Sequence, residues 1–404
     1  MLDFTEEQKL AQQAIRSWCA QHLEPKVAAM EAGELSVYPI MRELSGTFGI
    51  ADMARAGFAR MKSRATETNA QARPAKSSGG MAGESALSAI LMIELSRVCP
   101  GFALAFGASL GLFGGAVMAK GTLEQKERWA LPAITLEKIG AWGLTEPGAG
   151  SDAFGSMKTR ARRDEGGFRL SGSKTFITNA PFADVFLIYA RMTGDEFSKT
   201  DVRAFIVERS ANGMSTSAPF KKMGMHASPT GEVFLDDVFV ASDQLLGGEA
   251  AEAGRTAAKS SLKGERFGMT PMCFGIVDRC LEESIRYAKQ REQWGKPIAS
   301  FQLVQEKIAK MYMARSIIQT LLLRQLEADA AGAGLSLEEA SASKLYCART
   351  TTECALDAVQ LMGGAGYMTG SVVEMMARDA KLFQIGGGTD EIQILRIARE
   401  LLQS

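Results

Sequence analysis

The 404-residue chain has little histidine and no excess of charge of either sign. Its two histidines, His22 and His226, are too few for a histidine-rich metal site and leave a Ser-His-Asp triad poorly supplied. Lysine plus arginine and aspartate plus glutamate number 46 each, so no global basic field exists to hold nucleic acid or an anionic membrane. We therefore expect no metal centre and no nucleic-acid partner.

Cysteine is also sparse, and its six residues are spaced as core residues. None forms a C-x-x-C pair, and Cys273/Cys280 and Cys347/Cys354 have the seven-residue spacing of one helix face. This pattern suits core packing in a reducing compartment. The N-terminal sequence MLDFTEEQKL has neither the basic start nor the apolar core of a signal peptide. We therefore predict a cytoplasmic protein.

Long apolar runs free of charge are lacking as well. The run from Gly101 to Ala119 comes closest, but its five glycines and Ser109 favour a pair of pocket-lining helices. No membrane span is therefore predicted.

The residue pattern changes along the chain from helical to strand-like and back to helical. Its start is helical and opens with a capping box, Thr5 to Gln8. Between about Thr159 and Val240, short runs rich in Val, Phe and Ile alternate with Gly, Ser and Asn, which predicts strands. After Gly247 the pattern is helical again. We predict three domains: an α-helical domain at 1–137, a β domain at 138–247 and an α-helical bundle at 248–404.

Individual segments can be predicted within these domains. Long helices are expected at Gln302–Ala331 and Leu337–Met362, and another long helix before them has a possible bend at Pro271. The segment Lys62–Gly83 lapses into small and basic residues and is predicted to be a mobile surface loop.

Two glycine clusters, Gly363–Gly366 and Gly386–Gly388, resemble parts of a dinucleotide-binding fingerprint. That fingerprint requires a preceding strand and an acidic residue about 20 positions later. Both clusters lie between helical segments, so a Rossmann domain is disfavoured. They are better explained as tight connections where backbone N–H groups can approach a phosphate or a carbonyl oxygen.

Six motifs in order along the chain resemble the acyl-CoA dehydrogenase family. They are WGLTEPGAGSD at 142–152, KTFITN at 174–179, KMGMHASPT at 222–230, REQWGK with FQ at 291–296 and 301–302, QLMGG at 360–364, and GTDEIQ at 388–393. The first and fourth are specific by themselves, whereas the glycine clusters alone would be weak. The N-terminal third resembles the family less closely.

The resemblance implies a fold and an activity. The expected fold class is α+β multidomain, with an N-terminal all-α domain, a middle β-barrel or sandwich-like domain and a C-terminal four-helix bundle. FAD would lie between the β domain and the bundle of a homotetramer. The enzyme would remove two hydrogens from Cα and Cβ of an acyl-CoA and pass electrons to an electron-transfer flavoprotein.

The family motifs also imply cofactor-binding residues. Thr145 and Thr178 would serve the polar edge of the flavin ring, Phe176 would lie against a ring face, and Ser151 would bind the cofactor or the pantetheine arm of the substrate. The other positions expected on this side are Trp142, Leu144, Gly150 and Ile177. A neighbouring subunit would contribute Arg291, Gln302, Gln360, Gly363 and Gly364, and Thr389 and Glu391 would face the FAD from the other side.

The catalytic base departs from the commoner family pattern. Many relatives carry a glutamate just before the Gly-Thr pair, where this chain has Gly387. A minority, including isovaleryl-CoA and long-chain acyl-CoA dehydrogenases, carries it on the first bundle helix, and Glu265-Arg266 matches that position. Glu265 is therefore the expected base, the Gly387 N–H would donate to the thioester oxygen, and Arg266 would hold the carboxylate or the pantetheine. The alternative is an ordinary solvated Glu265 paired with a nearby lysine.

Other functions on the same scaffold remain open at this point. A carrier-protein thioester could replace the CoA thioester, as in acyl- or aminoacyl-carrier-protein dehydrogenases. A flavin-dependent hydroxylase would need no base at Glu265. A non-enzymatic helical scaffold is disfavoured by the intact cofactor motifs.

Overall fold

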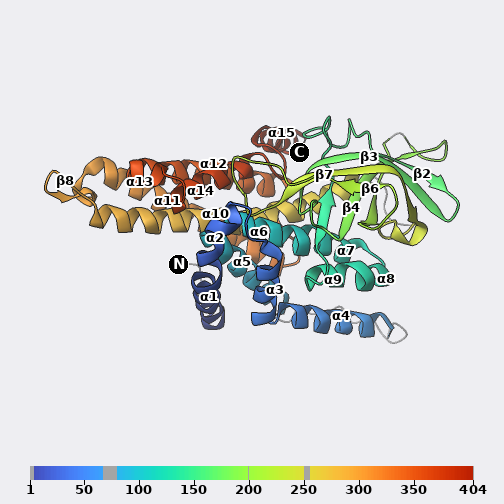
Figure 1. Cartoon of the computed structure of the whole chain (residues 1–404), viewed down its shortest axis with the longest axis horizontal. Helices are drawn as coiled ribbons and strands as arrows, with labels where there is room; N and C mark the ends of the chain where they lie inside the picture. The colour runs from blue at the N-terminus through green and yellow to red at the C-terminus, as the bar shows by residue number, and fades with distance from the viewer. Residues whose placement is uncertain (1–3, 67–79, 199, 250–254, 404) are drawn as a thin grey trace.

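Helical segments form both ends of the chain and flank a β domain in the middle (Figure 1). A computed structural model describes residues 4–66, 80–198, 200–249 and 255–403, with only the backbone described at 66, 80–84 and 255–267. The long axis runs from the tip of the C-terminal bundle, at β8 (Glu292–Gln293), to the β domain at the opposite end (Figure 1).

The N-terminal helices form a short stack beside the bundle and the sheet. Their bounds are α1 Glu6–Trp18, α2 Val27–Glu31, α3 Val37–Thr47, α4 Ile50–Thr66, α5 Gly80–Val98, α6 Pro100–Gly107, α7 Gly115–Lys120, α8 Leu123–Gln125 and α9 Leu131–Ile134. The predicted capping box is confirmed, because the Thr5 hydroxyl accepts from the Gln8 N–H and the Gln8 side chain accepts from the Thr5 N–H.

The middle domain is a curled seven-stranded sheet. Its strands are β1 Gly140–Gly143, β2 Arg160–Asp164, β3 Gly167–Thr178, β4 Val185–Thr193, β5 Val202–Glu208, β6 Met214–Thr216 and β7 Thr230–Ala241. The order is β1-β4-β2-β3-β7-β6, and β5 pairs with the other edge of β4. β1 and β2 run parallel to the start and end of β4, whereas the remaining pairs are antiparallel.

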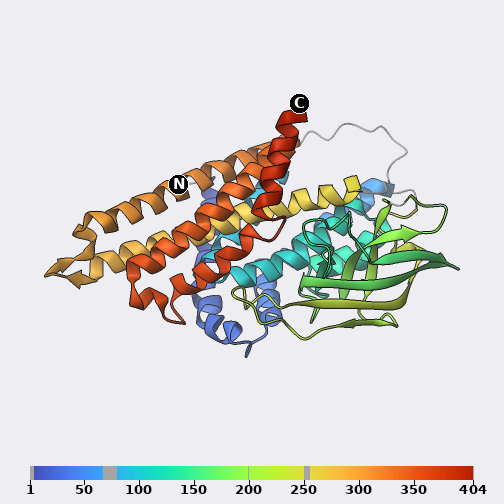
Figure 2. The same ribbon diagram turned by 90° about the horizontal axis from the view of Figure 1, so that it is seen from above.

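The C-terminal domain is built on long helices that run along the molecule (Figure 2). Its elements are α10 Arg255–Gln290, β8 Glu292–Gln293, β9 Lys296–Pro297, α11 Gln302–Ala330, α12 Leu337–Met362, α13 Gly364–Tyr367, α14 Val372–Ala380 and α15 Asp390–Gln403. α10 continues through Pro271. α12 has the predicted bounds, and it starts at a capping box between Ser336 and Glu339.

One hydrophobic core connects all three domains. The same buried cluster contains Ile93 of α5, Phe186 of β4 and Ile276 of α10, each with no exposed surface. The β domain is therefore packed against both helical domains rather than tethered to them. All six cysteines are buried and unbonded, four of them in α10 and α12, as the heptad spacing predicted. The predicted α+β multidomain fold class is confirmed.

The predicted loop Lys62–Gly83 is wrong at both ends. Residues 62–66 continue α4 and residues 80–83 begin α5, while 67–79 lie outside the described residues. Residues 62–66 contain no large apolar side chain, so periodicity missed the end of α4, although Lys, Arg and Ala have good helix propensity.

The apolar run is the helical stretch Pro100–Lys120. By length and composition alone it could cross a membrane, but 56% of its apolar window is buried inside the protein. Phe113 packs directly over Gly140 of β1, where an added Cβ would overlap its ring.

Candidate active site

The first part of the site is a loop that follows β1. Lys174 of β3 is fully buried and donates to the Leu144 carbonyl at 3.0 Å and to the Glu146 carboxylate at 2.8 Å. Glu146 also accepts from the backbone N–H groups of Lys158 and Thr159. Burial lowers the pKa of Lys174 to about 8, against the opposing attraction of Glu146. Burial alone would raise the pKa of Glu146, but Lys174 and the other donors outweigh it and lower that pKa.

This ion pair fixes the loop against the end of β3. The Thr175 N–H donates to the Thr145 carbonyl at 2.9 Å, so the two threonines lie side by side. The pairing of β3 with β7 is interrupted by a bulge between Lys174 and Ile177.

The bulge turns Phe176 out of the sheet. Its φ is +59°, a left-handed conformation that is uncommon for a bulky residue, and its side chain is 69% exposed. Its ring packs edge-on against Phe220 at 5.9 Å. Strained backbone of this kind concentrates at binding sites, where the surrounding structure maintains it.

Polar groups around Phe176 lack partners within the part of the chain that the structure describes. The hydroxyls of Thr145 and Thr178 make no hydrogen bond there. The indole Nε1 of Trp142 is buried and has no acceptor in the same region, and the ring packs edge-on against Tyr189 at 5.3 Å. Unpaired polar groups beside an exposed aromatic ring fit a planar ligand with a polar edge.

The remaining predicted residues on this side differ in what they can present to a ligand. The side chains of Leu144 and Ile177 are buried in apolar clusters, so only their main-chain atoms can face a ligand. Gly150 and Ser151 are exposed on the loop after β1.

The second part of the site is the glycine loop before α15. Gly387 and Gly388 have φ of +63° and +93°, which glycine adopts without strain. Lys344 of α12 donates to the Gly388 carbonyl at 2.7 Å, and Gln393 donates to both glycine carbonyls. The Gly387 N–H has no acceptor among the described residues. The loop is thus held by its carbonyls and leaves an N–H available.

The expected base lies on the helix beside this loop. A Cβ on Gly386 would be 3.8 Å from the Met269 methyl group, so α10 and the glycine loop are in contact. Glu265 and Arg266 lie on the turn of α10 before Met269, and four residues, about one helical turn, separate Glu265 from Met269. Their side chains lie outside the described part. At the start of α15, the Thr389 hydroxyl accepts from the Ile392 N–H and Glu391 is exposed.

The residues expected to serve a neighbouring subunit lie far from these two parts. They sit at the tip of the bundle, next to β8 and α13, at the opposite end of the long axis from the β domain (Figure 1). The side chains of Arg291, Gln302 and Gln360 are exposed and make no hydrogen bond within the described residues. Gly363 and Gly364 are exposed beside them.

The same tip exposes large apolar side chains. Trp294 is 85% exposed, Tyr367 is 78% exposed and Met368 is 65% exposed. Apolar groups clustered in this way mark a surface that another molecule covers.

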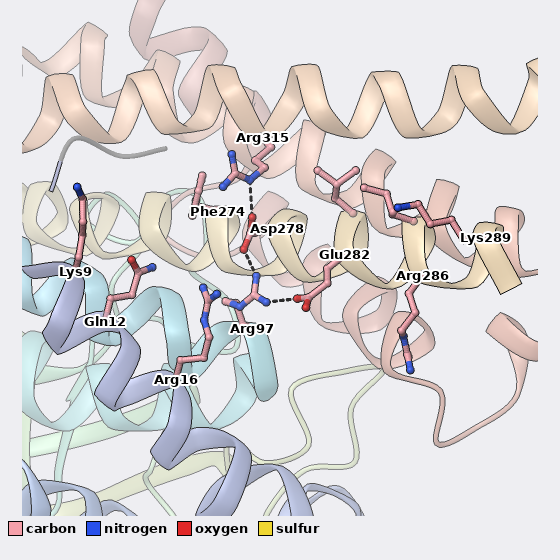
Figure 3. A pocket seen from close by; sticks show the side chains of 12 residues that line it. Lys9, Gln12, Arg16, Arg97, Phe274, Asp278, Glu282, Arg286, Lys289 and Arg315 are labelled. Carbon is pink, nitrogen blue, oxygen red and sulfur yellow. Dashed lines mark hydrogen bonds and ion pairs between the residues drawn. The ribbon is translucent and has the colours of Figure 1, made fainter. Parts of the chain in front are cut away.

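A cavity of about 670 Å³ lies elsewhere, between α1, α5, α10 and α11 (Figure 3). None of the predicted site residues lines it. Arg97 pairs with Asp278 and Glu282, and Arg315 also pairs with Asp278 at 2.5 Å. Arg16, which also lines the cavity, pairs with Glu94 at 2.8 Å. These arginines are already paired with carboxylates, so this partly open pocket is lined by an ion-pair network and is not the predicted site.

A charged cluster that the sequence did not predict joins the segment 222–228 to both helical domains. Glu31 of α2 lies 3.3 Å from His226 and 3.2 Å from Arg378 of α14. The Met225 N–H donates to Asp379, which is fully buried. Burial and the nearby Glu31 raise the pKa of Asp379 to about 7, although the Met225 N–H and Arg378 oppose the rise. The KMGMH motif was the only signal of this junction.

Comparisons with known proteins match nearly the whole chain. Models of the N-terminal, middle and C-terminal domains of acyl-CoA dehydrogenases match residues 5–137, 141–238 and 252–402. The mitochondrial isovaleryl-CoA dehydrogenase of Arabidopsis thaliana is 35% identical over 314 residues, which are 78% of this chain and 76% of that protein. The 3-(aryl)acrylate reductase of Clostridium sporogenes is 32% identical over 400 residues, 99% and 100% of the two chains.

The fold is also similar to that of solved structures. The crystal structure of an acyl-CoA dehydrogenase complexed with FAD from Bacillus anthracis has a TM-score of 0.85 and 29% identity to this chain. That match covers 99% of this chain and 68% of the other.

Proposed function

The chain belongs to the acyl-CoA dehydrogenase family, and we propose that it is an oxidoreductase that removes two hydrogens from Cα and Cβ of an acyl-CoA. The observation that carries this proposal is the exposed, left-handed Phe176 beside the unpaired hydroxyls of Thr145 and Thr178. Such a site suits a flavin, which is planar and has one polar edge.

FAD is the cofactor that fits these residues. When bound, it supplies a two-electron acceptor that takes a hydride from the substrate. Phe176 would lie against a face of the ring, and the hydroxyls of Thr145 and Thr178 would bind its polar edge. The Glu146–Lys174 pair would keep the loop after β1 in place while the cofactor binds.

The glycine loop and α10 would provide the acid–base chemistry. The α-proton of a thioester is too weak an acid for a carboxylate unless the negative charge that develops on the thioester oxygen is stabilised. The unpaired Gly387 N–H would donate to that oxygen. Glu265, one helical turn before the residue that contacts this loop, would take the α-proton as general base. Arg266 beside it would hold the base or the pantetheine arm.

A second subunit would complete each cofactor site. Arg291, Gln302, Gln360 and the Gly363-Gly364 pair lie at the other end of the molecule from Phe176, so they would bind the FAD of a neighbour. The exposed apolar tip around Trp294 supports association at that end. We propose a homotetramer that works in the cytoplasm and passes electrons to an electron-transfer flavoprotein.

The reverse reaction is a second candidate. A relative that matches nearly the full length of this chain is a 3-(aryl)acrylate reductase. In that direction Glu265 would donate a proton to Cα instead of removing one, so the same residues would serve reduction of an α,β-unsaturated compound.

The experiment is to purify the protein, record its visible spectrum and add acyl-CoAs of varied length and branching without oxygen. Bleaching of the flavin band by at least one acyl-CoA is expected. A flavin that no acyl-CoA bleaches, but that reoxidises with an enoyl-CoA or an arylacrylate after chemical reduction, would favour the reductase. A protein without flavin would contradict both proposals.

A further inference from the structure

Asn179, the residue that follows Thr178, has hydrogen-bond partners for all of its side-chain and main-chain polar groups. Asn179 is fully buried and has a φ of +67°. Asparagine tolerates this left-handed conformation better than most residues, but it still needs support from its surroundings. Asn179 and Phe176 thus bracket Ile177 and Thr178 with two left-handed residues.

The Asn179 side chain joins three elements. Its Nδ2 donates to the Ala105 carbonyl of α6 at 2.9 Å and to the Gly140 carbonyl of β1 at 3.3 Å. Its Oδ1 accepts from the hydroxyl of Tyr38 on α3 at 3.1 Å. The amide cannot be reversed, because Oδ1 would then face two carbonyl oxygens and Nδ2 would meet the hydroxyl alone.

The main chain of Asn179 is equally engaged. Its N–H donates to the Pro229 carbonyl at 2.7 Å, and its carbonyl accepts from the N–H groups of Phe182 and Ala183. Pro229 directly precedes Thr230, the partner of Thr178 in the β3–β7 ladder. Every polar group of Asn179 therefore fixes the end of β3 against a neighbour.

Tyr38 of α3 is the second N-terminal residue that binds the Asn179 side chain, besides Ala105 of α6. It is 7% exposed, and burial raises the pKa of its hydroxyl, so it remains a donor at all ordinary pH values. Asn179 lies 141 residues further along the chain. The N-terminal helices thus reach the end of β3 through the Tyr38 hydroxyl and the Ala105 carbonyl.

We propose that Asn179 and Tyr38 are positioning residues that set where Thr178 meets the edge of the flavin. This inference rests on the proposed function, because it takes Thr178 as a flavin contact. Loss of the Tyr38 hydroxyl leaves Oδ1 unpaired and allows the amide to move, which displaces Thr178 without removing any group that touches the cofactor.

The test compares Tyr38→Phe and Asn179→Gly with the wild-type holoenzyme. Glycine keeps the left-handed backbone but removes the amide. Tyr346→Phe is the matched control, since Tyr346 of α12 also has a side-chain hydrogen bond, to Thr350, and lies in the bundle. The measurements are the midpoint potential and visible circular dichroism of the bound FAD, and kcat and KM with the best acyl-CoA.

Tyr38→Phe is expected to shift the flavin potential and dichroism and to lower kcat on the order of 5–10-fold, with KM within about twofold, as for one lost hydrogen bond. Asn179→Gly should do so more strongly, and Tyr346→Phe should do neither. An unchanged potential, spectrum and kcat in Tyr38→Phe would overturn the inference, as would equal shifts in Tyr346→Phe. A wild-type flavin that no acyl-CoA reduces would instead refute the proposed function. The flavin potential and dichroism of Tyr38→Phe, compared with those of the wild type, would still test the role of Tyr38.

Discussion

Replacing Lys174 with methionine tests whether the buried ion pair holds the cofactor loop. Lys174 has no exposed surface and Glu146 is almost as buried, so the change leaves a carboxylate with only the Lys158 and Thr159 N–H groups. Breaking one half of a buried pair costs about 3–5 kcal/mol, because the remaining charge keeps its desolvation penalty. The Leu144 carbonyl also loses its donor.

The free energy of unfolding, measured by urea titration, should therefore fall by about 3–5 kcal/mol in Lys174→Met. FAD content should fall with it, since Thr145 lies on the released loop. Adding Glu146→Gln should recover part of the loss, because the unpaired charge is then removed.

The matched control is Lys138→Met. Lys138 lies 3.9 Å from Glu208 in an exposed pair, and such pairs contribute about 0–1 kcal/mol. If Lys174→Met loses no more stability than Lys138→Met, the buried pair does not hold the loop and the argument from burial is refuted.

Three further predictions concern the base, the shared site and the junction. Glu265→Gln should keep the fold and its FAD but slow flavin reduction by acyl-CoA about 10²–10⁴-fold in stopped-flow measurements, and near-normal reduction would remove Glu265 from the mechanism. Arg291→Ala should lose FAD and weaken assembly in gel filtration, whereas Arg60→Ala on the exposed face of α4 should do neither; full FAD content in Arg291→Ala would count against a shared site. The pKa of Asp379 in the folded protein is raised to about 7, so the folded protein keeps a proton that the unfolded chain releases near pH 4. The free energy of unfolding should therefore fall as pH rises from about 4 to 7 and then level off. Asp379→Asn should flatten that window by an amount on the order of 3–4 kcal/mol, and an unchanged pH profile would mean that another group titrates there.

The helical frame could be predicted from the sequence because its signals are local. α12 begins and ends where periodicity and its flanking residues indicated, and the cysteines in α10 and α12 face the core as their spacing required. The end of α4 at 62–66 was missed because it contains no large apolar side chain, although its Lys, Arg and Ala residues support a helix.

The geometry of the site depends on contacts that no local pattern encodes. The motifs named Phe176 and Thr178, but they gave no sign of the bulge that exposes Phe176 or of the Glu146–Lys174 pair beside it. The support from Tyr38 comes from a residue 141 positions away. A sequence motif can include a residue such as Asn179 without indicating which distant residues it contacts.

The length of α10 gives the strongest physical argument for a site shared between subunits. Glu265 lies near its start and Arg291 directly follows its last residue, so 26 residues separate them along one continuous helix. At 1.5 Å per residue the two positions are roughly 39 Å apart. One flavin that has its reacting ring at Glu265 would have to extend along most of the bundle to reach Arg291 of the same chain.

This distance allows the shared site to be tested with oligomers that contain two different variants. If Arg291 serves a neighbour, a subunit carrying Glu265→Gln paired with one carrying Arg291→Ala has one site with both defects and one site with neither. Co-expression of two differently tagged chains, purified through both tags, should therefore restore roughly half of the wild-type activity per dimer, although each parent is nearly inactive. If each chain builds its own site, both sites stay defective and no activity returns, because no subunit then contains an intact pair of Glu265 and Arg291.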